Sequence, residues 1–208
     1  MSEGAVERSF GETLSSDSRS HLQSLVVLLE KWNPAINLVA TASLTDVWRR
    51  HIADSAQILA HLPDHARTWL DLGSGGGFPG LVVAILAKEK APDLCVELVE
   101  SDQRKCVFLQ TAVRSLGLAA TVTRSRIEAL TPRRADVISA RALAGMDQLL
   151  RYCQPHLAPG GICLFLKGAH VETELAEAEK SFKFNLKLFP NEIDNAGFVV
   201  RIADLANV

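Results

Sequence analysis

The apolar positions in the first third of the chain predict two helices. Spacings of 3, 4 and 7 residues place one set of apolar side chains on a single helical face: Leu22, Leu25, Val26, Leu29 and Trp32. Asp17 or Ser18 is placed to cap this helix, and Pro34 should end it. A second amphipathic helix is predicted over residues 44–62, where a Pro-Asp pair closes the segment.

From residue 67 onward, short β-branched runs alternate with longer amphipathic stretches. This alternation is typical of β-α units around a parallel sheet. Strands are predicted over residues 68–72, 95–99, 119–123, 136–139, 162–166, 186–189 and 198–202, and helices over residues 79–90, 103–116, 145–156 and 172–182. The predicted fold class is therefore α/β and Rossmann-like, with a seven-stranded sheet.

The last two predicted strands are joined only by the turn-like segment PNEIDNAG. A connection this short cannot contain a crossover helix, so the two strands should pair antiparallel. A mostly parallel sheet that ends in an antiparallel hairpin is typical of class I methyltransferases. Dinucleotide dehydrogenases, in contrast, usually continue with parallel strands.

Length and composition indicate one domain. The chain has 208 residues, of which 48% are hydrophobic, which is enough for one sizeable core. We expect a single domain over residues 1–208, made of a helical extension (1–66) and a Rossmann-like core (67–208). The first dozen residues are polar and acidic, and the longest wholly apolar run is only residues 81–87. We therefore expect no signal or transit peptide, no membrane span, and a soluble cytoplasmic protein.

Cysteine usage and charge limit the partners. Four cysteines, Cys95, Cys106, Cys153 and Cys163, show no C-x-x-C pair and no histidine at metal-ligand spacing. We expect them to be buried, reduced thiols, and we expect no metal. The net charge is −2, whereas nucleic-acid-binding domains are usually basic. Only the central third, residues 67–142, is basic, with 11 Lys and Arg against 8 Asp and Glu.

The sequence DLGSGGGFPG, residues 71–80, lies where a predicted strand ends and a helix begins. Gly73, Gly75 and Gly77 would let the main chain run against a ligand, because glycine lacks a Cβ and adopts positive φ at little cost. The same glycines could instead serve only a tight strand-to-helix connection. No Gly-Lys-Ser/Thr follows, which excludes a P-loop, and G-x-G-x-G differs from the pyrophosphate-binding spacing G-x-G-x-x-G.

The ends of two further strands carry candidate chemistry. Glu100 closes the strand after the glycine-rich turn, where this fold class places the carboxylate that accepts ribose hydroxyls; a surface carboxylate is the alternative. The fourth strand ends in Ser139-Ala140-Arg141. It lacks the Asn/Asp-Pro-Pro-Tyr/Phe motif used on exocyclic amines and the Pro-Cys nucleophile used on cytosine C5. Guanine N7 requires neither, since it offers a lone pair and carries no proton.

Short motifs are spread over nearly the whole chain. They are Lys31-Trp32-Asn33 with Asn37-Leu38, Arg50-His51-Ile52 with Asp54-Ser55, residues 73–80, Ser139-Ala-Arg141, and Lys167-Gly168. Their order and spacing resemble the glucose-inhibited division protein B family of 16S ribosomal RNA guanine-N7 methyltransferases. One departure is Ala140, since some members have the serine and the arginine adjacent.

The resemblance implies an enzyme that transfers a methyl group from S-adenosylmethionine to guanine N7 of 16S ribosomal RNA, at guanine 527 in the 530 loop of the small subunit. It implies cofactor contacts at Gly73, Phe78, the pair Ile127-Glu128, and Arg141, with Glu128 beside the adenine edge. No general base is expected. The expected partner is 16S ribosomal RNA, within the small subunit or an assembly intermediate, and the protein is expected to be a monomer.

Basic residues near these motifs are candidates for RNA contact. Arg50 and His51 are assigned to an RNA-facing rim because of their motif, and Lys167, at the end of the fifth strand, to a substrate phosphate. Arg104 and Lys105 begin a predicted helix, where cations oppose the helix dipole. They should either pair with Glu100 or Asp102 or contact phosphate.

Five arginines are crowded between residues 124 and 141: Arg124, Arg126, Arg133, Arg134 and Arg141. This density suits RNA phosphates. A solvated charged face is the more usual meaning, and we expect it for all of them except Arg141.

Three other functions stay open from the sequence. The same cofactor could serve a protein or small-molecule acceptor, and a cofactor site without activity could belong to an RNA-binding scaffold. A nicotinamide oxidoreductase is disfavoured, because Tyr152 is the only tyrosine and His156, not a lysine, follows it four residues later.

Overall fold

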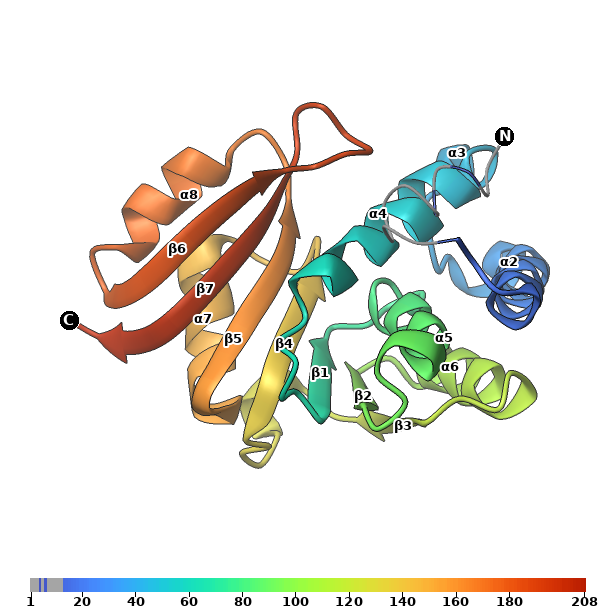
Figure 1. Cartoon of the computed structure of the whole chain (residues 1–208), viewed down its shortest axis with the longest axis horizontal. Helices are drawn as coiled ribbons and strands as arrows, with labels where there is room; N and C mark the ends of the chain where they lie inside the picture. The colour runs from blue at the N-terminus through green and yellow to red at the C-terminus, as the bar shows by residue number, and fades with distance from the viewer. Residues whose placement is uncertain (1–3, 5, 7–12) are drawn as a thin grey trace.

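The computed structural model describes residues 4, 6 and 13–208 (Figure 1). Most of the polar leader predicted at 1–12 therefore lies outside the described residues. Among the helices that are described, none combines the length and the apolar character needed to cross a membrane.

Seven strands form one sheet in the order β3-β2-β1-β4-β5-β7-β6. The strands are β1 (Thr68–Leu72), β2 (Cys95–Glu100), β3 (Ala120–Arg124), β4 (Ala135–Arg141), β5 (Leu157–Lys167), β6 (Phe182–Pro190) and β7 (Phe198–Asn207). β1 to β5 pair in parallel, and β7 runs antiparallel to both β5 and β6. The predicted mostly parallel sheet with a terminal hairpin is confirmed. The insertion of β7 between β5 and β6 was not predicted.

Helices cover the two faces of the sheet in separate groups. One hydrophobic cluster unites α2 (Ser16–Ile36), α5 (Gly80–Lys90) and α6 (Gln103–Ser115) with one sheet face, and another unites α7 (Met146–Cys153) and α8 (Val171–Ala178) with the other face. Adjacent residues of β1 show the alternation, since Trp69 belongs to the first cluster and Leu70 to the second. α5 is buried from Gly80 to Ala87 because it lies between the sheet and α2.

The first helix differs from its prediction at both ends. Ser15, rather than Asp17 or Ser18, is the N-cap, and its side chain accepts a hydrogen bond from Ser18 N. The helix also continues through Pro34 to Ile36, so the predicted end at Pro34 is wrong. Pro34 stands in the last turn, where its missing N–H removes one hydrogen bond without breaking several turns.

The second predicted helix is a series of short turns of different width. It comprises α3 (Thr41–Leu44), a wide π-type turn η1 (Trp48–Ala53), α4 (Asp54–Ala56) and a tight 3₁₀ turn η2 (Gln57–His61). Two further 3₁₀ turns are η3 (Ile127–Ala129) and η4 (Gln154–His156). The helix predicted over 172–182 extends too far, because Phe182 already begins β6. π-type turns are frequent at functional sites, and η1 carries Arg50 and His51.

The cysteine prediction holds in part. All four cysteines are free thiols, and Cys106, Cys153 and Cys163 are buried. Cys95 is exposed, contrary to expectation, because it is the first residue of β2 at the margin of the sheet.

Candidate active site

The loop between β1 and α5 requires glycine at three positions. Gly73, Gly75 and Gly77 have φ angles of 65°, 55° and 88°, which other residues rarely adopt. A Cβ on Gly77 would lie 2.3 Å from Leu81 Cδ1, and a Cβ on Gly73 would lie 2.6 Å from Leu143 Cδ1. The backbone conformation therefore favours glycine at all three positions, and packing adds to this preference at Gly73 and Gly77.

Glu100, at the end of β2, fastens this loop. Its Oε2 accepts a hydrogen bond from Gly75 N at 2.9 Å, and its Oε1 accepts from Ser101 N at 2.7 Å and Asp102 N at 2.8 Å. The side chain is buried, so the alternative of a solvated surface carboxylate does not hold. A carboxylate has about four lone-pair sites, which leaves one to accept a hydrogen bond from a ligand.

A cavity of about 580 Å³, which we name the loop cavity, opens over the glycine-rich loop. Most of the residues predicted to hold the cofactor line it: Gly73, Gly75, Phe78, Glu100, Ile127, Glu128 and Arg141. Gly77 is absent from this lining, because it faces Leu81 and Leu109 instead. The volume lies within the range of about 300–1,000 Å³ that is usual for small-molecule sites.

Tyr152 is a residue of this cavity that the sequence analysis missed. It comes from α7, lines the loop cavity, and donates a hydrogen bond from its hydroxyl to Glu128 Oε1 at 2.9 Å. This hydrogen bond raises the pKa of Tyr152. The pKa of Glu128 is lowered, first by its own backbone N–H and then by Tyr152. No local signal could have paired them, since 24 residues separate the two.

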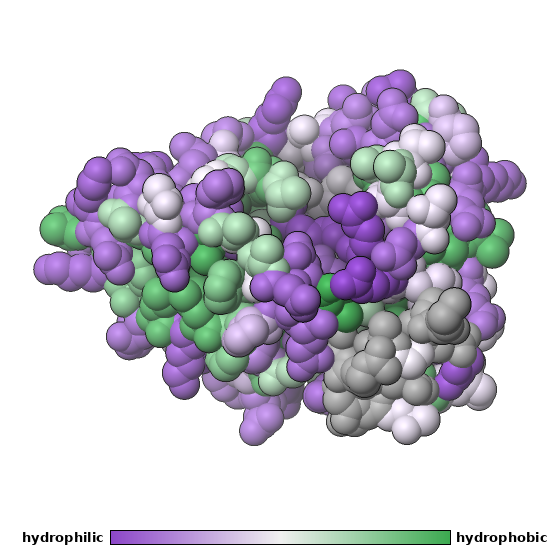
Figure 2. Space-filling model, turned by 90° about the horizontal axis from the view of Figure 1, so that it is seen from above, coloured by the Kyte–Doolittle hydropathy of each residue, from purple (hydrophilic) through white to green (hydrophobic). Residues whose placement is uncertain are grey.

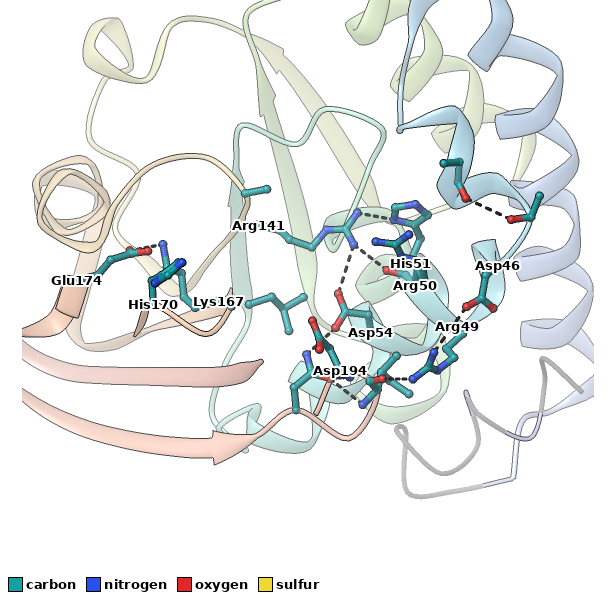
Figure 3. Close-up of a pocket in the computed structure, with 17 residues that line it drawn as sticks. Asp46, Arg49, Arg50, His51, Asp54, Arg141, Lys167, His170, Glu174 and Asp194 are labelled. Atoms are coloured by element: carbon teal, nitrogen blue, oxygen red, sulfur yellow. Dashed lines mark hydrogen bonds and ion pairs between the residues drawn. The ribbon is translucent and has the colours of Figure 1, made fainter. Parts of the chain in front are cut away.

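A second cavity of about 780 Å³, the outer cavity, shares His51, Arg141 and Ala142 with the loop cavity (Figure 3). Its other walls come from η1, from the end of β5 and from the β6–β7 connection. Seen from above, hydrophilic side chains surround a hollow in the middle of the molecule (Figure 2). His51, Arg141 and Ala142 together form the wall between the two cavities, which we name the shared wall.

Arg141 dominates this shared wall. Its Nη2 lies 2.8 Å from His51 Nδ1, and its Nη1 donates to Asp54 Oδ2 at 3.3 Å and to the carbonyl oxygen of Arg50 at 3.1 Å (Figure 3). The guanidinium carbon lies 5.2 Å from the centre of the Phe78 ring. These contacts fix the direction of Arg141 toward the cavities. Ala140, the departure from the family pattern, lies in the hydrophobic cluster on the other face.

His51 is held neutral between two partners. Its Nδ1 faces Arg141, which can only donate, so Nδ1 accepts and Nε2 donates to Ser43 Oγ at 2.7 Å. Burial, Arg141 and Arg50 lower the pKa of His51 to about 4. The ring also stacks on Phe78, with 5.0 Å between ring centres.

A buried polar chain lies beneath the glycine-rich loop. Trp69 Nε1 donates to Ser139 Oγ at 2.7 Å, and Ser139 Oγ donates to Asp71 Oδ1 at 2.6 Å. Burial raises the pKa of Asp71 to about 6, against the opposing effect of its hydrogen bonds. Asp71 belongs to the glycine motif, but the sequence alone gives it no role, because its partner Ser139 lies on β4.

The basic residues predicted for RNA are separated by the fold. Arg104 is exposed and pairs with Asp102 at 3.7 Å, whereas Lys105 lines the loop cavity. Lys167 lines the outer cavity, but its Nζ pairs with Glu174 at 2.5 Å and donates to Ala144 O at 3.0 Å. Arg50 also lines the outer cavity, and its exposed guanidinium has no partner among the described residues.

The five crowded arginines do not form one surface. Arg126 and Arg141 line the loop cavity. Arg133 instead pairs with Glu97 at 2.9 Å. It lines a third cavity beside the first residues of β1 and β2, at the amino ends of the strands. Residues 124–141 pass from the carboxyl end of β3 to the amino end of β4 and back to its carboxyl end. Arginines that are close in the sequence therefore lie at different ends of the strands.

No group of three or more His, Cys, Asp or Glu side chains within the described part of the chain could hold a metal ion.

Comparison with known families gives one match over most of the chain. Residues 18–194 match the family described as rRNA small subunit methyltransferase G. The protein named ribosomal RNA small subunit methyltransferase G from Cereibacter sphaeroides is 47% identical over 195 residues, which cover 94% of this chain and 95% of the relative. The protein of the same name from Rhodospirillum centenum is 47% identical over 193 residues, covering 93% and 87%.

Solved structures share the fold at low sequence identity. A SAM-dependent methyltransferase from Aquifex aeolicus has a TM-score of 0.59 at 15% identity, covering 86% of this chain and 97% of that chain. M. jannaschii TYW2 in complex with AdoMet has a TM-score of 0.54 at 13% identity, covering 82% and 78%. The predicted class I methyltransferase fold is therefore confirmed.

Proposed function

The chain belongs to the rRNA small subunit methyltransferase G family, and from that premise we propose that it methylates N7 of a guanine in 16S ribosomal RNA. The proposed position is guanine 527 in the 530 loop, which is the site that the family resemblance implies. S-adenosylmethionine is the methyl donor of this chain.

The loop cavity fits the donor. Glycine backbone forms its floor, and because glycine has no Cβ a bound ligand can lie against the main chain. Glu100 retains a free lone-pair site for a ribose hydroxyl. We assign Ile127 and Glu128 to the adenine, and Phe78 and Arg141 to the side that faces the outer cavity. Gly77 acts indirectly, by permitting the turn of the loop. When bound, the donor supplies a methyl group on a sulfonium sulfur, which a neutral nitrogen can accept.

The shared wall of the two cavities is the observation that carries the assignment to N7. Both ring nitrogens of His51 are engaged and its pKa is about 4, Arg141 is a cation, and Ala142 has no ionisable side chain. None of the three can remove a proton from an acceptor near neutral pH. Guanine N7 has no proton to lose, so holding the base in line and excluding water are sufficient.

The outer cavity is the proposed acceptor site. Arg50 offers an unpaired guanidinium at its rim, and Lys105 lies at the loop cavity, so these two are our first candidates for phosphate contacts. His51 acts by orienting Arg141. Lys167 and Arg104 already have acidic partners, which makes them weaker candidates.

A labelling experiment tests the proposal. With labelled S-adenosylmethionine, purified 30S subunits, naked 16S ribosomal RNA, cell protein and free metabolites are offered separately. Label should enter ribosomal RNA alone, and mass mapping should locate one 7-methylguanine, at a position that becomes sensitive to reduction and aniline cleavage. Label in protein or in a small molecule would favour the alternative acceptor and overturn the proposal. The rate of the chemical step should depend little on pH near neutrality.

We also propose a single-domain monomer that acts in the cytoplasm, where an rRNA acceptor would be found. Leu22, Leu25 and Leu29 of the N-terminal extension share one hydrophobic cluster with α5 and α6, which supports folding as one unit. A single thermal transition and a monomeric mass in solution are the expected results.

A further inference from the structure

Two cations face each other directly across the strands β6 and β7. Lys187 and Arg201 are register partners in this antiparallel pair. Their side chains lie on the same face as Phe189, because alternate residues of a strand share a face. We name the surface formed by Lys187, Phe189, Arg201 and His61 the β6–β7 face.

This face lies opposite the one that α7 and α8 cover. Phe182, Phe184 and Leu188 of β6 pack with Val200 and Ile202 of β7 in the cluster that contains those two helices. Lys187 and Arg201 occupy the alternate positions and point the other way. In Figure 1 no helix lies in front of β6 and β7 on the side that faces the viewer.

Neither cation is neutralised. Among the described residues, the Lys187 ammonium and the Arg201 guanidinium make no ion pair and no hydrogen bond, in contrast to Lys167, Lys180 and Arg133. Like charges directly opposite each other destabilise an antiparallel pair. Lys187 is exposed and Arg201 is half-buried. Two like charges in this arrangement are unfavourable for folding and are suited to an anion that bridges both cations.

The N-terminal extension adds a third group to this surface. His61, at the end of η2, stacks on Phe189 with 4.0 Å between ring centres. Its pKa is lowered, first by burial and then by Arg201, which shows that the guanidinium is near the ring. The two half-buried rings add an aromatic surface beside the cations, on which a base of single-stranded RNA can stack while the cations bind its phosphates.

The face leads into the outer cavity. β6 ends at Pro190, and the next residue, Asn191, lines the outer cavity and donates to Asp54 Oδ1 at 2.7 Å. Asp54 in turn accepts from Arg141 at the shared wall. Lys187 precedes Asn191 by four residues, which is about 13 Å along a strand. A strand of RNA with its target base in the outer cavity could therefore pass over this face.

We propose that the β6–β7 face binds backbone phosphates of the substrate RNA next to the target guanine. The inference rests on the proposed function. The occupant is RNA because two unpaired cations lie beside an aromatic surface, on strands that lead to the acceptor cavity. β6 and β7 are the last two strands of the chain. They lie outside residues 67–142, the segment with an excess of basic residues, so composition alone does not indicate this face.

The substitution Lys187→Glu tests this proposal, because it should raise the stability of the fold and lower the affinity for RNA. Glutamate would face Arg201 across the strands, so the thermal unfolding temperature should rise. The affinity for a 16S ribosomal RNA fragment should fall about fivefold or more, and the salt dependence of binding should become shallower by about one ion. The affinity for S-adenosylmethionine should not change. Lys180→Glu, in the turn before β6, is the matched control, because it changes the net charge equally and should leave RNA binding nearly unaltered.

Each outcome has one meaning. Unchanged RNA affinity and salt dependence for Lys187→Glu would overturn the inference, as would an equal loss for Lys180→Glu, which would indicate a general charge effect. Loss of binding to 30S subunits but not to naked RNA would assign the face to a ribosomal protein. Self-association of Lys187→Glu without a change in RNA affinity would mean that the lysine only protects an edge strand. If the unaltered protein binds the donor but labels no ribosomal RNA, the proposed function fails first.

Discussion

Arg141 Nη2 lies 2.8 Å from His51 Nδ1, although 90 residues separate the two in the chain. The contact joins the π-type turn η1 of the N-terminal extension to the end of β4. It holds a guanidinium at the boundary of the two cavities and, with Phe78 beneath both groups, leaves it little freedom to rotate. The extension therefore completes the site as well as the hydrophobic core.

Replacing His51 with phenylalanine should impair catalysis more than folding. Phenylalanine keeps the stack on Phe78 but offers no acceptor to Arg141, and an unpaired donor there costs about 1–3 kcal/mol. We expect kcat/KM for 16S ribosomal RNA to fall by about tenfold or more, while the affinity for S-adenosylmethionine changes less. Steady-state kinetics and calorimetric titration measure the two.

Ser43→Ala is the graded control for this experiment. It removes the partner of His51 Nε2, together with the hydrogen bond from Ser43 Oγ to Ala40 O, and leaves the Arg141 contact in place. Its effect on kcat/KM should be smaller than that of His51→Phe. Equal effects would show that the histidine acts through the fold of η1, without orienting Arg141.

The pH dependence of stability should reveal His51 and Asp71 as opposing groups. The pKa of His51 falls from 6.5 to about 4 on folding. The stability that the neutral histidine contributes is therefore fully present above pH 6.5 and is lost as the pH falls toward 4. The pKa of Asp71 rises from 3.8 to about 6, so the folded protein gains stability as pH falls from 6 toward 3.8. Each effect is on the order of 3 kcal/mol, and the two nearly cancel.

Single substitutions should separate these two effects. Relative to the unaltered protein, Asp71→Asn should lose stability more steeply between pH 7 and about 4.5, because the histidine acts without opposition. His51→Phe should show the reverse trend. Urea denaturation over this range measures both slopes. Parallel curves for all three proteins would contradict the assignment.

The glycines of the loop should differ in their tolerance of alanine. Gly77→Ala combines positive φ with a clash against Leu81 and should cost about 2 kcal/mol or more. Gly75→Ala has no atom closer than 3.8 Å and should cost about 1 kcal/mol. Gly117→Ala, with φ of 56° and open space around its Cβ, is the control for backbone strain alone. If Gly77→Ala matched Gly117→Ala, the packing argument would be wrong.

Gly73→Asp should abolish most of the donor affinity. A Cβ at this position would lie 2.6 Å from Leu143 Cδ1. The carboxylate beyond it would extend into the loop cavity or displace the loop. We expect S-adenosylmethionine affinity to fall by about tenfold or more. Calorimetric titration against Gly117→Ala measures this. Equal affinities would mean that the donor binds elsewhere.

Tyr152→Phe should weaken donor binding without changing the saturated rate. The substitution removes the hydroxyl that donates to Glu128 Oε1 and leaves the aromatic ring in place. A lost hydrogen bond to a carboxylate at an exposed position should reduce affinity by a few fold. A rise in KM for S-adenosylmethionine with unchanged kcat is the expected pattern. A fall in kcat alone would place Tyr152 on the acceptor side.

Local patterns were sufficient for most of the elements. β1 has the bounds that its apolar run predicted, and the short PNEIDNAG connection correctly predicted the antiparallel hairpin. The glycine motif predicted a tight strand-to-helix turn, and the positive φ angles of its glycines confirm the turn, whereas binding of a ligand there stays a prediction. These features depend on a few adjacent residues, whose conformational limits do not change with the rest of the fold.

The sequence by itself therefore determined the α/β alternation, the glycine turn and, through its motifs, the family. Only the tertiary structure decided the place of β7 between β5 and β6 and the contact between His51 and Arg141. It also decided that Lys167 pairs with Glu174, and that the like charges of Lys187 and Arg201 face each other across two strands. The physical reason is that backbone preferences act over a few residues. The environment of a charge, in contrast, depends on which distant strands and turns pack beside it.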